Sequence, residues 1–148
     1  MRGENDPAAT AKAIIDANLY MVLGTADEHG HAWVSPVYYA PVDYRELIWV
    51  SRPETLHSHN LIAQPQVSIV IFDSSVPIST GQGVYMAATA EEVTGDARGA
   101  AIEVFAGSRA EAGHEQQVEG EPKAIARGDQ PGVHGRVQDE VHLRIGCD

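Results

Sequence analysis

The chain has 148 residues, of which 43% are apolar, and carries a formal net charge of −11, so one globular domain that buries roughly 70% of its unfolded surface is expected. The negative charge excludes a typical nucleic-acid-binding protein, which needs a clustered basic face. No apolar run approaches the ~20 residues that span a bilayer and the start lacks a signal-peptide core, so we expect a cytoplasmic protein without a membrane span.

The first part of the chain predicts a helix and a β-hairpin. Asp6 and Pro7 are typical of a helix start, and the helix is expected over 8–17. A first strand over 20–25 is followed by a turn in which Gly30 is free to take a positive φ, and a second strand is expected over 31–39. A polar turn over 41–46 then precedes a third strand over 47–50.

The next part predicts two helices and two strands. A helix is expected to open at Pro53 and to end near Ala63, before Pro65. The stretch 67–72 is almost continuously apolar and β-branched, which predicts a strand buried on both faces. A loop over 73–83, a strand over 84–93 and a helix from 96 to about 106 follow. Beyond them only 141–145 alternates like a strand.

The turn between the third strand and the second helix carries the strongest functional signal. Ser51, Arg52, Thr55 and His57 stand where the helix begins. Free backbone N–H groups at a helix start, flanked by hydroxyls and a cation, form a phosphate site. The turn is therefore a candidate clamp for a cofactor phosphate. The alternative is an ordinary helix cap with a solvated arginine.

Three segments in this order resemble the pyridoxamine-phosphate-oxidase-like family of flavin-binding split barrels: 20–37, 48–72 and 81–91. The resemblance implies an α+β, mainly β fold, a six-stranded antiparallel Greek-key split β-barrel with short flanking helices. It also implies a homodimer that holds flavin mononucleotide (FMN), or the deazaflavin F420, in a groove between subunits. We expect residues 1–113 to form this domain and residues 114–148 to be a divergent tail that contributes at most a last strand.

The resemblance also assigns site residues. Val34, Ser35, Pro36 and Val37 would line the flavin ring through the strand backbone, and Trp49, Val50 and Ser51 would flank the ring and ribityl chain. Around the phosphate the family pattern places Arg52, Thr55, Leu56 and His57. Asn60 would buttress that turn from the helix, and Gln82 would reach the ring from the facing strand.

Two departures from the family pattern bear on the ligand. Relatives carry an Arg-Lys pair near Thr55 to His57, whereas Arg52 is the only formal cation between Leu47 and Thr94. A charge-assisted phosphate contact contributes more than a neutral one, although hydroxyls, helix N–H groups and a protonated His57 could compensate in part. Relatives end in a strand with arginine and aromatic residues, whereas no Trp, Tyr or Phe follows Phe105. We therefore expect that the tail after about His114 has diverged or has been altered by a frameshift.

Other site classes have weaker support in the sequence. His57 and His59 are two apart on a helix and point in different directions, while His29 and His31 lack an evident third ligand, so no metal site is expected. Ser35 and His57 could be imagined as a nucleophile and its base, but Ser35 lies in a strand without a Gly-x-Ser-x-Gly elbow. The single Cys147 excludes an internal disulfide and a cysteine-based zinc site.

The expected function is that of an FMN- or F420-dependent oxidoreductase acting on a small molecule, in which the cofactor supplies the redox chemistry. No residue stands out as a catalytic acid or base, and the sequence leaves the substrate open. One alternative is a non-catalytic split barrel that binds or stores flavin or haem, with haem the less expected ligand. Another is a structural dimer that only supports a partner surface.

Overall fold

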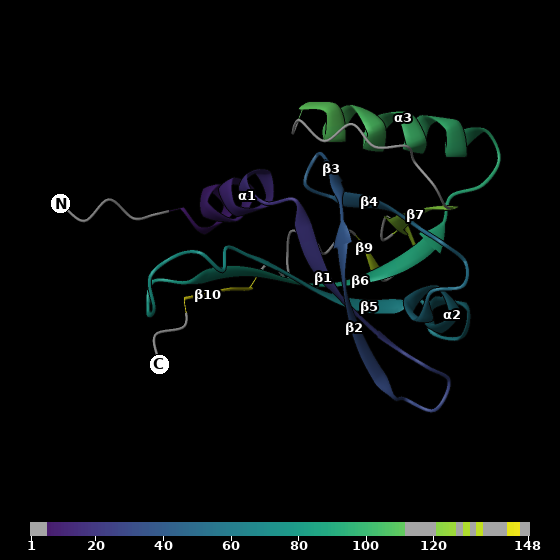
Figure 1. Ribbon diagram of the computed structural model, residues 1–148, viewed down its shortest axis with the longest axis horizontal. Coiled ribbons are helices and arrows are strands. Elements are labelled where there is room, and N and C mark those ends of the chain that lie inside the picture. The colour runs from purple at the N-terminus through teal and green to yellow at the C-terminus, as the bar shows by residue number, and fades with distance from the viewer. Residues whose placement is uncertain (1–5, 112–120, 127–128, 131–132, 135–141, 146–148) are drawn as a thin grey trace.

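The computed structural model describes residues 6–111, 121–126, 129–130, 133–134 and 142–145 of the chain (Figure 1). The elements in these ranges are, in chain order, α1 (Pro7–Ala17), β1 (Tyr20–Ala26), β2 (Ala32–Tyr38), β3 (Ala40–Val42), β4 (Glu46–Ser51), α2 (Leu56–Ala63), β5 (Gln66–Phe72), β6 (Gln82–Glu92), α3 (Asp96–Glu111), β7 (Glu121–Ala126), β8 (Asp129–Gln130), β9 (Val133–His134) and β10 (His142–Ile145). The expected α+β, mainly β class is confirmed.

Local sequence signals form the first helix and hairpin as expected. Asp6 is the N-cap of α1, and its Oδ1 accepts a hydrogen bond from the Ala8 N–H at 3.1 Å. The buried side of α1 is formed by Ala11 and Ile15. Gly30 takes a φ of 82° in the turn between β1 and β2, so the predicted glycine turn is confirmed.

The main sheet has the strand order β2-β1-β5-β6-β7-β4-β3, with β10 paired to β6. Every paired strand runs antiparallel to its neighbour. The two end strands of this order, β2 and β3, are separated in the chain by Tyr39 alone. The sheet must therefore curl until its two ends meet, although no ladder between β2 and β3 closes it within the described residues.

The curl encloses one core and leaves a second, smaller one outside. The inner core includes Met21, Leu23 and Trp49, all fully buried, together with Ala11 and Ile15 of α1. The outer cluster lies where α3 crosses β3 and β4, and is formed by Ala40, Ile48, Ala101 and Phe105. Figure 1 shows α3 along this side of the strands and α2 beside the end of β5. The inner core therefore fixes α1, and the outer cluster fixes α3.

Several sequence-based expectations about strands differ from the structure. The main sheet holds eight strands rather than six, and the closed Greek-key barrel is not found among the described pairings. The expected turn over 41–46 is shorter, because Asp43 and Tyr44 both adopt positive φ and bring β3 back onto β4 as a tight hairpin. The strand β7, which pairs with both β4 and β6, was not predicted.

The expectation that 67–72 is buried on both faces is wrong. In β5 the side chains of Val67, Ile69 and Ile71 are buried, whereas Ser68 and Phe72 are exposed. The curled sheet covers only its inner face, so an antiparallel strand within it alternates however apolar its sequence is.

Two expectations concern parts of the chain with limited description. The expected domain boundary at 113/114 lies outside the described residues, as do Cys147 and Val141. The remainder of the expected last strand is present as β10. Within the described part of the chain, no helix has the length and apolar character needed to span a membrane.

Candidate functional site

The polar side chains that are buried in the described part of the chain gather around α2. They are Thr25, Ser35, Ser51, His57, Ser58 and Asn60. Three belong to α2 itself, and the other three come from β1, β2 and β4. The other two helices, α1 and α3, rest on apolar clusters instead. Buried polar groups are normally hydrogen-bonded, so this polar layer is an organised feature of the fold.

Three members of the layer form a hydrogen-bonded trio centred on an imidazole. The Nε2 atom of His57 lies 2.6 Å from Ser51 Oγ, and its Nδ1 atom lies 3.2 Å from Ser35 Oγ. His57 is 7% exposed, Ser35 8% and Ser51 6%. The trio therefore links α2 to β4 and to β2, and sequence reasoning had assigned all three residues to the site.

The start of α2 has the geometry of a capped helix with a short polar turn before it. Thr55 is the N-cap, and its Oγ1 accepts from the Ser58 N–H at 3.4 Å. The helix begins at Leu56, later than the predicted Pro53, because Thr55 is in an extended conformation. The N–H groups of Leu56 and His57 belong to the first turn, which has no intrahelical acceptors. An anion could therefore bind these N–H groups beside the exposed Arg52.

Asn60 secures α2 to β1. Its Nδ2 donates to Thr25 Oγ1 at 3.1 Å, and Thr25 Oγ1 lies 3.5 Å from the backbone oxygen of Trp33. Asn60 thus ties α2 to β1, and its expected role of buttressing the turn from the helix stays a prediction. Sequence reasoning missed Thr25. The signal was its alternation with Met21 and Leu23, which places a polar residue on the inner face of β1.

The other expected site residues are distributed over several surroundings. On β2, Val34 and Pro36 point outward while Val37 is in the core. Trp49 is also in the core, where its Nε1 has no hydrogen-bond partner among the described residues. Val50 packs against the outer cluster, and Leu56 is half exposed.

Gln82 does not join the trio within one chain. It starts β6, whereas Thr89, seven residues on, pairs with Gln66 just after α2. At roughly 3.3 Å per residue, Gln82 lies roughly 23 Å along β6 from Thr89. A contact of Gln82 with a ligand at the turn would have to come from a second copy of the chain.

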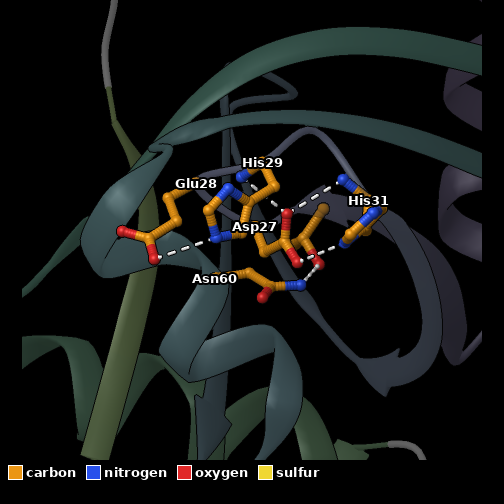
Figure 2. A network of polar contacts seen from close by, with 6 residues as sticks. Asp27, Glu28, His29, His31 and Asn60 are labelled. Carbon is orange, nitrogen blue, oxygen red and sulfur yellow. Dashed lines mark hydrogen bonds and ion pairs between the residues drawn. The ribbon is translucent and has the colours of Figure 1, made fainter.

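The histidines of the β1–β2 turn are hydrogen-bonded to the carboxylate of Asp27. Asp27 Oδ1 accepts from the backbone N–H groups of His29 at 2.8 Å and His31 at 2.9 Å, and Oδ2 lies 3.0 Å from His31 Nδ1 (Figure 2). The backbone N–H of His31 is the largest cause that lowers the pKa of Asp27. Across the described ranges, no three His, Cys, Asp or Glu side chains converge as metal ligands.

The hydrogen bonding also bears on the nucleophile reading of Ser35 and His57. The two side chains are within hydrogen-bond distance, as that reading required. Both are almost fully buried, however, and the second imidazole nitrogen is bonded to Ser51. The arrangement suits orientation of polar groups better than nucleophilic attack.

Comparison with known proteins gives one family match and several similar folds. The family model described as pyridoxamine 5'-phosphate oxidase matches residues 8–128. No curated protein matches the chain in sequence. A heme binding protein from Mycobacterium smegmatis has a similar structure, with a TM-score of 0.67 and 21% identity over 83% of this chain and 52% of that one. The chain thus spans about half the length of that relative.

Two further solved structures are similar along most of both chains. HutZ, the heme storage protein from Vibrio cholerae, has a TM-score of 0.63 and 20% identity over 84% of this chain and 89% of that one. The conserved hypothetical protein Rv2991 from Mycobacterium tuberculosis has a TM-score of 0.64 and 17% identity over 99% and 93%. These similarities concern the fold.

Proposed function

The chain belongs to the pyridoxamine 5'-phosphate oxidase-like family, and from that premise we propose that it binds a planar cofactor by an anionic group held at the turn from Ser51 to His57. The cofactor is of the flavin or haem type, since FMN and F420 carry phosphate and haem carries propionates. The observation that carries the proposal is the polar layer beneath α2, which fixes a helix N-terminus next to an exposed arginine.

Local geometry has to supply the affinity for an anion. The net charge of −11 creates an unfavourable general field for an anionic ligand. Arg52, together with the first-turn N–H groups of Leu56 and His57, provides donors of the kind that bind phosphate or carboxylate. The trio of Ser35, His57 and Ser51 holds these donors in place from below.

Binding or storage of the cofactor is favoured over catalysis. Two of the similar structures are named for heme binding and heme storage. The buried polar groups at the turn bond to one another or to the backbone, so none is presented to a substrate as an acid or base. An FMN- or F420-dependent oxidoreductase is the second candidate, supported by the family and by the helix N-terminus as a phosphate site.

The proposed functional unit is a homodimer. The outer face of β2, β1, β5 and β6 carries large apolar side chains that are exposed in the described part of the chain, including Tyr20, Val34, Phe72 and Tyr85. Strand register puts Pro36, Val22, Val70 and Tyr85 in one row across this face. Such a face is suited to self-association.

Absorption spectra of the purified protein, before and after incubation with FMN, F420 or haem, test the proposal. We expect a stable complex with one of them, with a Soret band if it is haem or flavin bands if it is FMN. Replacing Arg52 with alanine should weaken binding about tenfold or more, because a charge-assisted contact is lost. Arg98→Ala on α3, outside the turn, is the matched control and should leave the affinity unchanged.

A protein that stays colourless and takes up none of the three cofactors would contradict the proposal. Equal effects of Arg52→Ala and Arg98→Ala on cofactor affinity would show that the turn from Ser51 to His57 does not bind the cofactor.

A further inference from the structure

The imidazole of His57 bridges the hydroxyl groups of two serines on different strands. One nitrogen is 2.6 Å from Ser51 Oγ and the other 3.2 Å from Ser35 Oγ, on strands β4 and β2. A neutral imidazole has one N–H donor and one bare acceptor nitrogen, whereas a hydroxyl can donate and accept. The roles of the two serines are therefore coupled through the position of a single proton on the ring.

Two hydrogen-bond arrangements are possible for this trio. If Nδ1 carries the proton, it donates to Ser35, and Ser51 must give its own proton to the bare Nε2. If Nε2 carries the proton, it donates to Ser51, and Ser35 gives its proton to Nδ1. Only in the second arrangement is the Ser51 proton available for another acceptor.

Ser51 lies where the buried trio meets the exposed turn. It is the last residue of β4, and the exposed Arg52 follows it directly. An anionic oxygen held at the turn accepts hydrogen bonds but cannot donate them. It is therefore compatible with Ser51 as a donor and is repelled by the lone pairs of Ser51 as an acceptor.

We propose that His57 is a positioning residue whose tautomer sets the Ser51 hydroxyl as a donor to the anionic group of the cofactor. Ligand binding selects the Nε2–H tautomer, in which Ser35 donates to Nδ1, Nε2 donates to Ser51, and Ser51 donates to the ligand. Ser35 thereby acts on the ligand through His57 without touching its anionic group. This inference rests on the proposed cofactor site.

Nitrogen NMR of the histidine ring in the wild-type protein gives the first test. The probes are FMN and, for the haem class, diamagnetic zinc protoporphyrin IX, at a pH at which the ring is neutral. We expect the cofactor-bound protein to show an unprotonated Nδ1 and a protonated Nε2 for His57. A bound protein in which Nδ1 keeps the proton would overturn the proposal.

A double-mutant cycle gives the second test. Ser35→Ala removes the donor to Nδ1 and should weaken cofactor binding about fivefold in the wild-type background, the effect of losing one hydrogen bond to a buried group. In a Ser51→Ala background the tautomer no longer matters to the ligand, so Ser35→Ala should then have almost no effect. Additive effects would overturn the proposal, because independent contacts give additive losses.

Controls separate this inference from the proposed function. Ser75→Ala, in the exposed loop after β5, should leave the affinity unchanged. If wild-type protein binds no cofactor, the proposed function fails first. If it binds but the cycle is additive or the wrong tautomer is found, only the role of His57 fails. Should either serine variant fail to fold, the NMR measurement on wild-type protein still decides.

Discussion

At the scale of single residues, the Asp27 turn shows how backbone N–H groups can lower the pKa of a partly exposed carboxyl group. Two backbone N–H groups and one imidazole nitrogen surround its oxygens. Hydrogen bonds to the charged form lower the pKa of Asp27 from its ordinary 3.8. Because the folded-state pKa is the lower one, the contribution to stability is present above pH 3.8 and is lost as the pH falls through the folded-state value.

We predict that His31→Gln keeps most of the lowered pKa of Asp27. The largest cause is the backbone N–H of residue 31, which the substitution retains, while the ring contributes less. Carbon NMR titration of the Asp27 carboxyl in both proteins measures this directly. A return of the pKa to 3.8 in the variant would identify the ring as the main cause.

At the scale of elements, the three helices are attached to the strands by different means. α3 rests on an apolar cluster, whereas α2 lies on the polar layer. α1 combines an apolar face with a buried hydrogen bond, in which Tyr39 Oη donates to the Ile15 carbonyl at 2.6 Å. Burial raises the pKa of Tyr39 above its ordinary value of 10.0. Tyr39 also joins β2 to β3, so one residue ties α1 to both ends of the sheet.

We predict that Tyr39→Phe lowers the free energy of unfolding by about 1 kcal/mol at neutral pH, because the buried Ile15 carbonyl loses its donor. Since the folded-state pKa of Tyr39 is raised, wild-type stability should also fall as the pH rises above 10.0, and the variant should lack this part of the decline. Denaturant unfolding at several pH values measures both effects.

Tyr44→Phe is the control for that prediction. Tyr44 Oη bonds to Asp16 in an exposed contact, so its loss should change stability by less than about 0.5 kcal/mol. Equal effects of the two substitutions would show that burial of the Tyr39 bond is unimportant.

We predict that Thr55→Ala destabilises the protein by about 1 kcal/mol through loss of the α2 N-cap. Thr55→Ser keeps the capping oxygen and should cost much less. Chemical denaturation of the three proteins measures the difference. If the alanine and serine variants are equally stable, the Thr55 hydroxyl does not cap α2 in solution.

At the scale of the whole molecule, the curled sheet has a covered inner face and an outer face that α3 covers at β3 and β4. Along β2, β1, β5 and β6 the outer face stays exposed in the described part of the chain. The same alternation that fills the core with Val67, Ile69 and Ile71 puts Phe72 on the outside. On the outer face, the rings of Tyr20 and Tyr38 lie with centroids 3.7 Å apart. An apolar surface of this kind favours association.

We predict that Tyr85→Asp converts a wild-type dimer into a monomer, because a charge would be buried at the proposed interface. Sedimentation velocity measures the change, and circular dichroism checks that the fold is kept. Ile78→Asp is the matched control, since Ile78 is 96% exposed in the loop before β6 and outside this face. A wild-type monomer, or a variant that remains dimeric, would contradict the interface.

Features that depend on neighbouring residues could be predicted from the amino-acid sequence. The Asp6 cap of α1, the Gly30 turn, most of the strands and the polar turn before α2 all follow from local propensity and alternation. The order of these segments was also sufficient to indicate the family, which the match over 8–128 confirms.

Which of these residues meet depends on how distant strands pair. Ser35 and His57 are 22 positions apart, and they come together because the curl of the sheet carries β2 toward α2. The same curl limits the burial of β5 to one face and puts Gln82 at the far end of β6. Long-range strand pairing is set by how the sheet closes on its core, and no local pattern in the chain contains that information.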